Sequence, residues 1–132
     1  MDFSELSVWV VEDDLQSWAI VSRLLEAVGV TDFTVTVKVD TVVQAMRKGI
    51  DIDVILIDVH IKDASGYDLL SEVKNNPEYA RTKGIMISAS TGPLGIRQAQ
   101  AANADGFISK PLTVDKIKRA FTQVVGGKQF WE

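Results

Sequence analysis

The sequence predicts an α/β domain built on a doubly wound, five-stranded parallel sheet with helices on both faces. Five short apolar runs each lead into a segment with helical periodicity, and the connections between them are short. Strict alternation of strands and helices favours parallel strands joined by crossover helices. The clearest run, Val54–Ile57, is apolar throughout, which is typical of a central parallel strand buried on both faces.

Each strand and helix can be placed on the chain from its residues. The strands are expected at Ser7–Val11, Phe33–Val39, Val54–Ile57, Ile85–Ser88 and Phe107–Ile108. The helices are expected at about Gln16–Val28, Thr41–Lys48, Tyr67–Asn75, Pro93–Asn103 and Val114–Val125. Gly29 and Gly49 are expected to end the first two helices. Glycine readily adopts the left-handed backbone conformation that terminates a helix.

The apolar residues of the first and last helices predict which face each helix turns toward the sheet. In the first helix, apolar residues recur at Ile20, Leu24 and Val28. In the last helix, they recur at Val114, Ile117, Phe121 and Val124. Both spacings bring the residues onto one side of a helix, so these side chains are expected to face the core.

Length and composition limit the number of domains and several classes of function. A chain of 132 residues, 46% hydrophobic and 24% charged, is expected to fold as one domain over residues 1–125, with 126–132 as a loose tail or the stub of a linker. The absence of cysteine excludes disulfides and thiolate chemistry. The net charge of −4 argues against direct binding to nucleic acid. Because no apolar stretch approaches the roughly 20 residues of a membrane span and no signal peptide opens the chain, we expect a cytoplasmic protein without membrane contact.

Charged residues follow three of the predicted strands at the point where each strand ends. Glu12 and Asp13 follow the first strand, Asp58 follows the third, and Lys110 follows the fifth. Open α/β sheets bind ligands at the carboxyl ends of their strands, so these groups favour a site for a divalent metal and a phosphoryl group. The alternative for the acidic residues after the first strand is a charge cluster at a helix N-terminus, a role that suits Asp14.

These residues, together with Ser88 at the end of the fourth strand and Pro111 after Lys110, resemble the receiver domain of two-component response regulators. The resemblance extends from about Ser7 to Val125. Within the family, the chain is similar to the single-domain, chemotaxis-type regulators. It implies a flavodoxin-like (βα)5 fold with the strand order 2-1-3-4-5. It also implies a phosphorylatable signalling switch of a phosphorelay, not an enzyme, although such a domain assists its own phosphorylation and dephosphorylation.

The resemblance assigns a chemical role to each residue of the predicted site. Asp58 is the expected phosphoacceptor, which receives a phosphoryl group from a sensor histidine kinase or a histidine phosphotransfer protein. The expected cofactor is Mg²⁺ (or Mn²⁺), held directly by Asp13, Asp58 and the main-chain carbonyl of His60, and by Glu12 through water. The alternative for Asp58 is a residue that caps the loop after the strand.

Three further residues are expected to sense the phosphoryl group. Ser88 and Lys110 would contact it. Phe107, which matches the aromatic residue of the family's switch on the fifth strand, would move inward as Ser88 moves toward the phosphate. The resemblance also implies a cis peptide bond between Lys110 and Pro111. The alternatives are a buried hydroxyl bonded to the backbone for Ser88, an ordinary surface lysine for Lys110 and a plain core aromatic for Phe107.

The loop after Asp58 both matches and departs from the family. Gly66 stands at the family's glycine position, whereas Lys62 replaces the usual proline, which loosens the loop. His60 and Ser90 occupy the two positions that tune hydrolysis of the acyl phosphate. An imidazole there predicts a pH-dependent phosphate lifetime, and the alternative is an exposed loop histidine.

Partner surfaces are expected in two places. Trp18 on the first helix is a candidate contact for the kinase or phosphotransfer protein, whereas Trp9 is expected in the core. The face formed by the fourth helix, the fifth strand and the fifth helix is a candidate surface for a homodimer or an output partner. Lys116, Lys118 and Arg119 on the last helix would lie on it, or would simply be a solvated basic face.

Two other functions compete with the phosphorylated switch. A receiver-like interaction module that needs no phosphorylation gains slight support from Lys62, but the intact acidic residues and Lys110 argue against it. An enzyme of flavodoxin-like architecture, either an FMN protein or an aspartate phosphatase, would need a phosphate loop after the first strand or a second acid where His60 stands.

Overall fold

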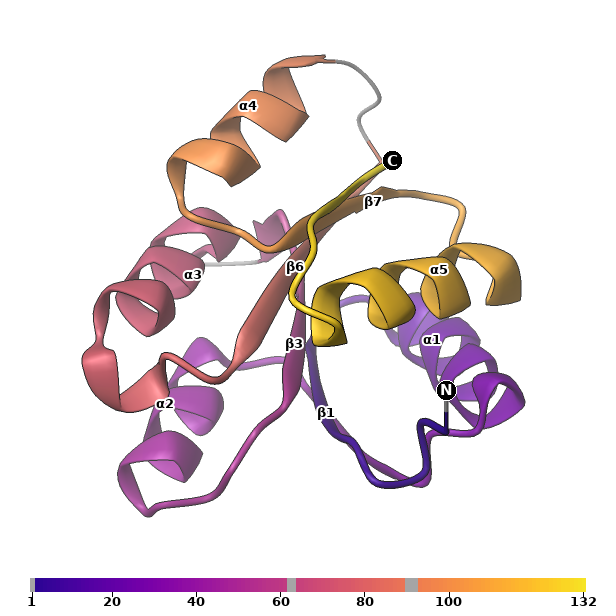
Figure 1. The fold of residues 1–132 in the computed structure, drawn as a ribbon, viewed down its shortest axis with the longest axis horizontal. Helices are drawn as coiled ribbons and strands as arrows, with labels where there is room; N and C mark the ends of the chain where they lie inside the picture. The colour runs from indigo at the N-terminus through magenta and orange to yellow at the C-terminus, as the bar shows by residue number, and fades with distance from the viewer. Residues whose placement is uncertain (1, 62–63, 90–92) are drawn as a thin grey trace.

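The computed structural model describes residues 2–61, 64–89 and 93–132, and its centre is a parallel sheet (Figure 1). The sheet has the order β2-β1-β3-β6-β7-β8. Its strands are β1 (Ser7–Val11), β2 (Asp32–Thr36), β3 (Val54–Asp58), β6 (Lys83–Ser88), β7 (Gly106–Ser109) and β8 (Phe130–Trp131). The first five positions reproduce the expected order 2-1-3-4-5, and β8 is an additional sixth strand.

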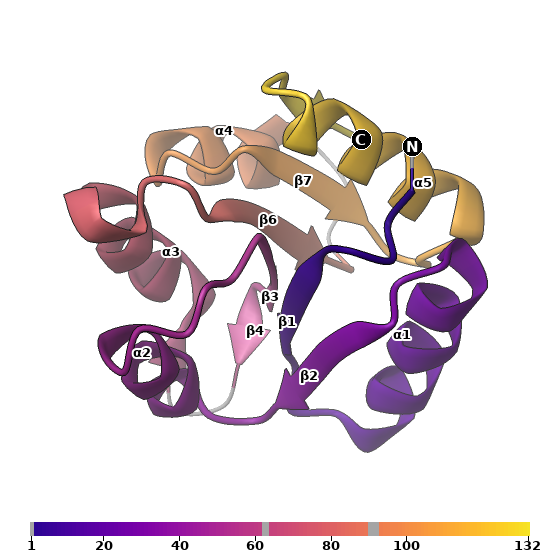
Figure 2. The same ribbon diagram turned by 60° about the horizontal axis from the view of Figure 1, so that its bottom comes forward.

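Helices cover both faces of the sheet, as expected (Figure 2). One face carries α1 (Leu15–Val28) and α5 (Val114–Val125), and the other carries α2 (Val39–Arg47), α3 (Gly66–Asn75) and α4 (Pro93–Ala101). A 3₁₀ turn, η1 (Pro77–Tyr79), follows α3, and a small antiparallel pair, β4 (His60–Ile61) with β5 (Ala64–Ser65), lies between β3 and α3. No helix in the described part of the chain is long and apolar enough to cross a membrane.

The core forms one apolar layer on each face of the sheet. Phe121 and Leu25 belong to the layer under α1 and α5, and Leu70 and Phe107 belong to the layer under α2, α3 and α4. All five residues of β3 are buried, since side chains of this strand point alternately into the two layers. This burial explains why the β3 sequence is apolar without interruption up to Asp58.

Several element boundaries differ from the expectation, and the ends of the second strand and the fourth helix differ by two or more residues. The second strand ends at Thr36 and not at Val39, which is already the first residue of α2. Thr36 pairs with Val11, the last residue of β1, and its hydroxyl then accepts the main-chain N–H of Lys38, so the chain turns away from the sheet. The fourth helix ends at Ala101 and not at Asn103, which adopts a left-handed conformation with a φ of 64°.

The buried face of α1 matches the predicted face only in part. Val28 is buried as predicted and Leu24 is partly buried against the core, but Ile20 is 55% exposed. Val21 and Leu25 are buried in addition. Both apolar sets have helical spacing, so periodicity alone does not separate them. The position of the helix start decides the rotation, because Asp14 caps α1 by accepting hydrogen bonds from the main-chain N–H and the hydroxyl of Ser17.

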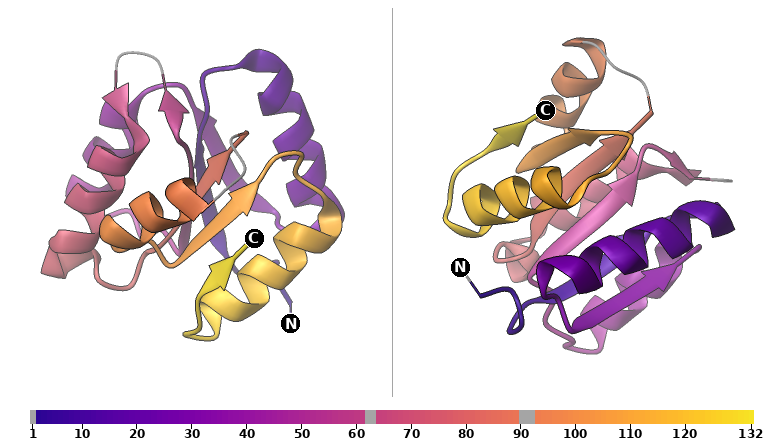
Figure 3. Two further views of the ribbon diagram at one scale, coloured as in Figure 1. Left: turned by 90° about the horizontal axis from the view of Figure 1, so that it is seen from above. Right: turned by 90° about the vertical axis from the view of Figure 1, so that its right-hand side faces the viewer.

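The C-terminal segment is not a loose end. Phe130 and Trp131 form β8, which pairs in parallel with Gly106 and Phe107 of β7 at the edge of the sheet (Figure 3). The side chain of Phe130 is only 2% exposed and belongs to the core. A strand of two residues has no periodicity of its own, so its burial depends entirely on contacts with residues distant in sequence.

Candidate functional site

Three charged side chains meet at the carboxyl ends of β1, β3 and β7. The Lys110 Nζ lies 2.7 Å from Asp58 Oδ2 and 3.1 Å from Glu12 Oε1. Glu12 and Asp58 are buried, whereas the Lys110 side chain is 28% exposed. The structure therefore brings Glu12, Asp58 and Lys110 together as expected, in a group that we call the acid–lysine cluster.

The backbone around Lys110 directs its side chain into this cluster. The Lys110–Pro111 peptide bond is cis, which confirms the expectation. The Lys110 N–H donates a hydrogen bond of 2.8 Å to the carbonyl of Ser88, so the residue that follows β7 stays tied to the end of β6. The ordinary-surface-lysine alternative is therefore wrong, since the ammonium is bonded to two buried carboxylates.

Main-chain contacts hold Asp58 on both sides. The His60 N–H donates to Asp58 Oδ1 over 2.7 Å, and the Val59 N–H donates to the carbonyl of Ile87 over 2.9 Å. Gly66 approaches the Asp58 carbonyl so closely that a Cβ at this position would lie 2.5 Å from the oxygen. The glycine at this position is thus required by close packing against the backbone of Asp58.

Burial and charge shift the protonation of the cluster. Burial, reinforced by the neighbouring Asp58 carboxylate, raises the pKa of Glu12, and Lys110 offsets this only in part. Burial alone would lower the pKa of Lys110, but its hydrogen bonds to Asp58 and Glu12 and their charges together raise it. The lysine therefore stays an ammonium at neutral pH, whereas ionised Glu12 is disfavoured in the folded chain.

This direction predicts that Glu12→Gln stabilises the chain at alkaline pH. A raised folded-state pKa means that the contribution of Glu12 to stability is complete below its ordinary value of 4.5 and is lost as the pH rises through the raised value. In the presence of EDTA, we expect the variant to exceed wild type by about 1 kcal/mol at pH 8 and to match it near pH 4. Urea unfolding at both pH values measures the difference, with the exposed Glu5→Gln as the control. A gain that is equal at both pH values would contradict the assignment.

Asp13 and the expected metal ligands occupy part of the same edge. Asp13 is half-buried directly after Glu12, and its N–H donates to Glu12 Oε2 over 3.1 Å. Within residues 2–61, 64–89 and 93–132, no three acidic or histidine side chains gather closely enough to enclose a metal ion by themselves. The carboxylates of Glu12 and Asp58 do converge on one point, the Lys110 ammonium. Hard oxygen donors of this kind fit Mg²⁺, which usually keeps several water ligands, and the site remains a prediction.

The expected sensing residues lie next to the cluster. Ser88 is buried at the end of β6 and pairs in register with Ser109 of β7. Phe107 is 1% exposed, and its ring lies 3.2 Å from the position of a Cβ at Gly95 of α4. The ring thus occupies a buried position in this structure, and its sensing role stays a prediction. The two expectations for Ser90 and Lys62 fall outside the described residues.

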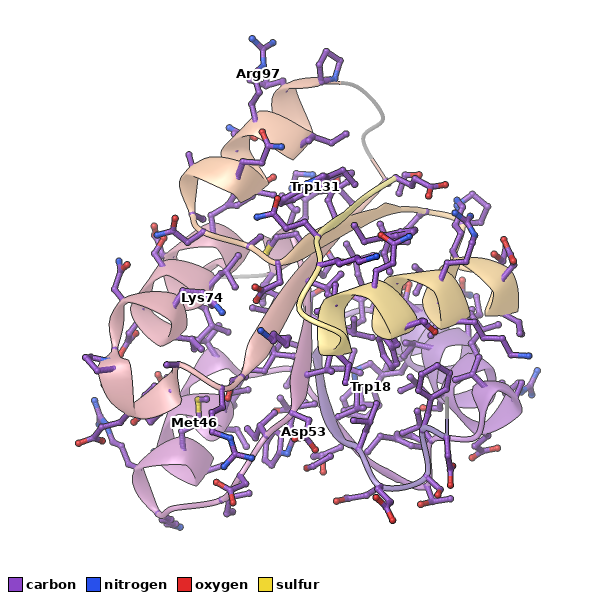
Figure 4. All side chains as sticks on the ribbon, viewed as in Figure 1. Trp18, Met46, Asp53, Lys74, Arg97 and Trp131 are labelled. Carbon is purple, nitrogen blue, oxygen red and sulfur yellow. The ribbon has the colours of Figure 1, made fainter. Side chains whose placement is uncertain are left out.

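Trp18 has a role that the sequence analysis missed. It was expected to be a partner contact, but it is half-buried and its indole N–H donates to the main-chain carbonyl of Glu12 (Figure 4). The side chain therefore fixes the turn between β1 and α1. The signal available in the sequence was its position one turn into the helix that follows Glu12, within reach of the strand end.

A cavity of about 400 Å³ opens beside the acid–lysine cluster. Its walls are mainly apolar and include Val21 of α1 and Leu112 after β7. Ile20 of α1 lines the same cavity, and Leu15 at the start of α1 is 71% exposed. An apolar surface thus adjoins the buried carboxylate of Asp58.

Comparisons with known sequences agree with the fold and with the site geometry. A sequence model of the family described as the response regulator receiver domain matches residues 8–122. The two-component response regulator ORR12 of Oryza sativa subsp. japonica is 30% identical over 120 residues, which span 89% of this chain and 96% of that protein. The chemotaxis protein CheY-3 of Vibrio cholerae is 27% identical over 122 residues, spanning 90% of this chain and 91% of that protein.

Solved structures share the fold. The chemotaxis response regulator CheY4 of Vibrio cholerae gives a TM-score of 0.79 at 22% identity, covering 90% of this chain and 98% of that chain. A response regulator from Thermotoga maritima gives 0.77 at 21% identity, covering 92% and 98%. These likenesses establish the flavodoxin-like architecture.

Proposed function

The chain belongs to the response regulator receiver family, and on that premise we propose that it is a signalling switch phosphorylated on Asp58. One observation carries the proposal. The carboxylate of Asp58 is buried at the carboxyl end of β3, yet it lies 2.7 Å from an ammonium that is itself partly open to solvent. Such a pair holds a nucleophile and a neutralising cation together, which suits phosphoryl transfer.

The transfer can be written in terms of the residues in the site. A carboxylate oxygen of Asp58 forms a bond to the phosphorus of a phosphohistidine while the phosphorus–nitrogen bond breaks and the imidazole leaves. The His60 N–H orients the carboxylate through Oδ1. The ammonium of Lys110, now bonded to Asp58 Oδ2, would shift its hydrogen bond to an oxygen of the phosphoryl group.

We propose that Mg²⁺ or Mn²⁺ is the cofactor of this transfer. Asp13, Asp58 and the main-chain carbonyl of His60 would hold the ion, and Glu12 would act through a water molecule. The ion supplies positive charge that neutralises the phosphoryl oxygens. The support for this proposal is the donor chemistry, since carboxylates converge at one strand edge without a competing soft ligand.

The proposed phosphodonor is a sensor histidine kinase or a histidine phosphotransfer protein. Receiver domains act with such partners. The exposed side chains of Leu15 and Ile20 on α1 offer a partner an apolar contact surface beside the cavity. Ser88, Lys110 and Phe107 are the proposed sensing residues, and α4, β7 and α5 form the proposed surface for output or dimer contacts. We place the switch in the cytoplasm and expect no catalytic turnover of other substrates.

The test is the intact mass of the chain after incubation with Mg²⁺ and acetyl phosphate. We expect wild type to gain about 80 Da, the mass of one phosphoryl group, and Asp58→Asn to gain nothing. Adding EDTA is expected to prevent the gain, because the transfer depends on the metal. A wild-type chain that binds Mg²⁺ but gains no mass would favour the phosphorylation-independent interaction module.

A further inference from the structure

The segment Lys128–Glu132, which we call the tail segment, lies along the outer edge of β7. Its two strand residues run parallel to β7, and its Trp131 packs against the apolar layer that contains Phe107 (Figure 4). The edge of the sheet at β7 lies between α4 and α5 (Figure 1). The tail segment therefore covers part of the surface proposed for output contacts.

Main-chain hydrogen bonds pair the end of the tail segment, from Phe130 to Glu132, with β7 and the residue before it. The Phe130 N–H donates to the carbonyl of Asp105 over 3.2 Å, and the Glu132 N–H donates to the carbonyl of Phe107 over 3.0 Å. The carbonyl of Glu132 accepts from both the N–H and the hydroxyl of Ser109, at 3.1 and 2.8 Å. Because these are backbone contacts, any extended segment of suitable side chains could make the same ladder.

Two side-chain contacts give the edge a preference for particular residues. Phe130 is buried, and the guanidinium of Arg119 on α5 lies 5.4 Å above its ring. Arg119 also bonds to the carboxylate of Glu132 and, 2.9 Å away, to that of Asp115. The backbone oxygen of Phe130 lies 3.0 Å from the position of a Cβ at Gly106, so a larger residue there would press the strand outward by a few tenths of an ångström. The edge thus selects an aromatic residue followed two positions later by an acid.

The link between the tail segment and α5 is short and conformationally permissive. Gly127 has a φ of +88°, Gly126 ends α5, and Lys128 and Gln129 are exposed. The attachment therefore consists of the buried Phe130, the partly buried Trp131, the Arg119 contacts and a short main-chain ladder, together with the bond from the Lys128 N–H to the Gln123 carbonyl. A strand held in this way can leave the edge without unfolding the rest of the sheet, as local opening at chain ends allows.

We propose that the edge of β7 is a docking site for an extended peptide strand of a partner, and that the tail segment is an internal competitor that masks it. The partner strand runs parallel to β7 and carries an aromatic residue at the position of Phe130 and a carboxylate at the position of Glu132. Affinity comes from the backbone ladder, and selectivity comes from the aromatic pocket beneath Arg119. The site lies outside the acid–lysine cluster, on the strand that carries Phe107.

The test measures binding of a fluorescently labelled peptide with the sequence of residues 126–132 to the full-length chain. An internal strand competes at a high effective concentration, so the wild-type chain is expected to bind the peptide weakly. The Phe130→Ala chain, whose own strand has lost its anchor, is expected to bind at least tenfold more tightly by fluorescence anisotropy. A peptide in which alanine replaces the phenylalanine should lose this binding, and the exposed Gln129→Ala chain should behave as wild type.

A second variant tests the same proposal if the Phe130→Ala chain fails to fold. Glu132→Lys places a cation beside Arg119 at an exposed position, so it weakens the tail segment without emptying the core and should also bind the peptide more tightly than wild type. Equal affinity for wild type and for a folded variant would overturn the proposal, as would no binding to either variant. Native mass spectrometry that finds a wild-type dimer lost in Phe130→Ala would assign the edge to a second copy instead and would also overturn it.

Discussion

Lys110→Ala is expected to slow phosphoryl uptake at Asp58 by about 100-fold or more, the usual effect of removing one charged donor from a reacting oxyanion. In the wild-type chain the Lys110 ammonium lies 2.7 Å from Asp58 and 3.1 Å from Glu12, so it is the cation nearest to the incoming group among the described residues. Alanine removes this cation from beside the buried carboxylate of Asp58, so the phosphoryl oxygens approach a negative charge without a neutralising ammonium. The rate of mass gain with acetyl phosphate and saturating Mg²⁺ measures the effect.

Two control variants show whether the slower uptake comes from the Lys110 ammonium itself or from the loss of any positive charge on the chain. Lys118→Ala removes a cation from the exposed side of α5 and is expected to leave the rate unchanged. Lys110→Arg keeps the charge but replaces a compact ammonium with a planar guanidinium, so we expect an intermediate rate. A Lys110→Ala chain that unfolds cooperatively and takes up phosphate as fast as wild type would remove Lys110 from the mechanism.

Gly66→Ala is expected to lower the free energy of unfolding by about 1–3 kcal/mol and to slow phosphoryl uptake at Asp58. The new Cβ would lie 2.5 Å from the Asp58 carbonyl, 3.0 Å from Ile57 and 3.1 Å from Met86. A backbone oxygen at the end of a buried strand cannot move aside as a flexible side chain does. The clash therefore shifts the residue that carries the nucleophile, and urea unfolding together with the phosphorylation rate measures both consequences.

The matched control is Gly49→Ala at the end of α2. Gly49 has a φ of +86°, but nothing lies within 4 Å of a Cβ built there. Alanine at this position is strained by its backbone conformation alone, at a cost of about 1 kcal/mol, and we expect phosphoryl uptake to stay at the wild-type rate. If Gly66→Ala and Gly49→Ala slow phosphorylation equally, the contact with Asp58 is not the cause.

The main elements of the fold could be predicted because their signals are local. The uninterrupted apolar run of β3 has a composition that only a strand buried on both faces explains, and α5 was predicted at its observed bounds, Val114–Val125. The acid–lysine cluster was also predictable, since parallel strands bring their carboxyl ends to one edge. Glu12, Asp58 and Lys110, which are far apart in sequence, meet there for that reason.

Other features could not be predicted because the local sequence was equally compatible with two arrangements of the side chains. The apolar sets that contain Ile20 and Val21 both have helical spacing, and only the capping by Asp14 and the packing against α5 and the sheet decide which one is buried. Trp18 presented a similar choice between an exposed contact and a bond to the Glu12 carbonyl. The position of Trp18 one turn into the helix permits this bond, but the choice depends on how the turn after β1 folds.

The sequence by itself determined the alternation of strands and helices and the residues that form the acid–lysine cluster. Those properties follow from the periodicity of apolar residues and from the polar residues at strand ends, which each segment carries independently of its neighbours. The strand order was expected only from the resemblance to receiver domains. Only the tertiary structure decided that Lys110 bonds to both carboxylates, that Gly66 is pressed against the Asp58 carbonyl and that residues 130–131 complete the sheet. Each of these depends on atoms brought together from distant parts of the chain, and their packing is fixed only when the whole domain has folded.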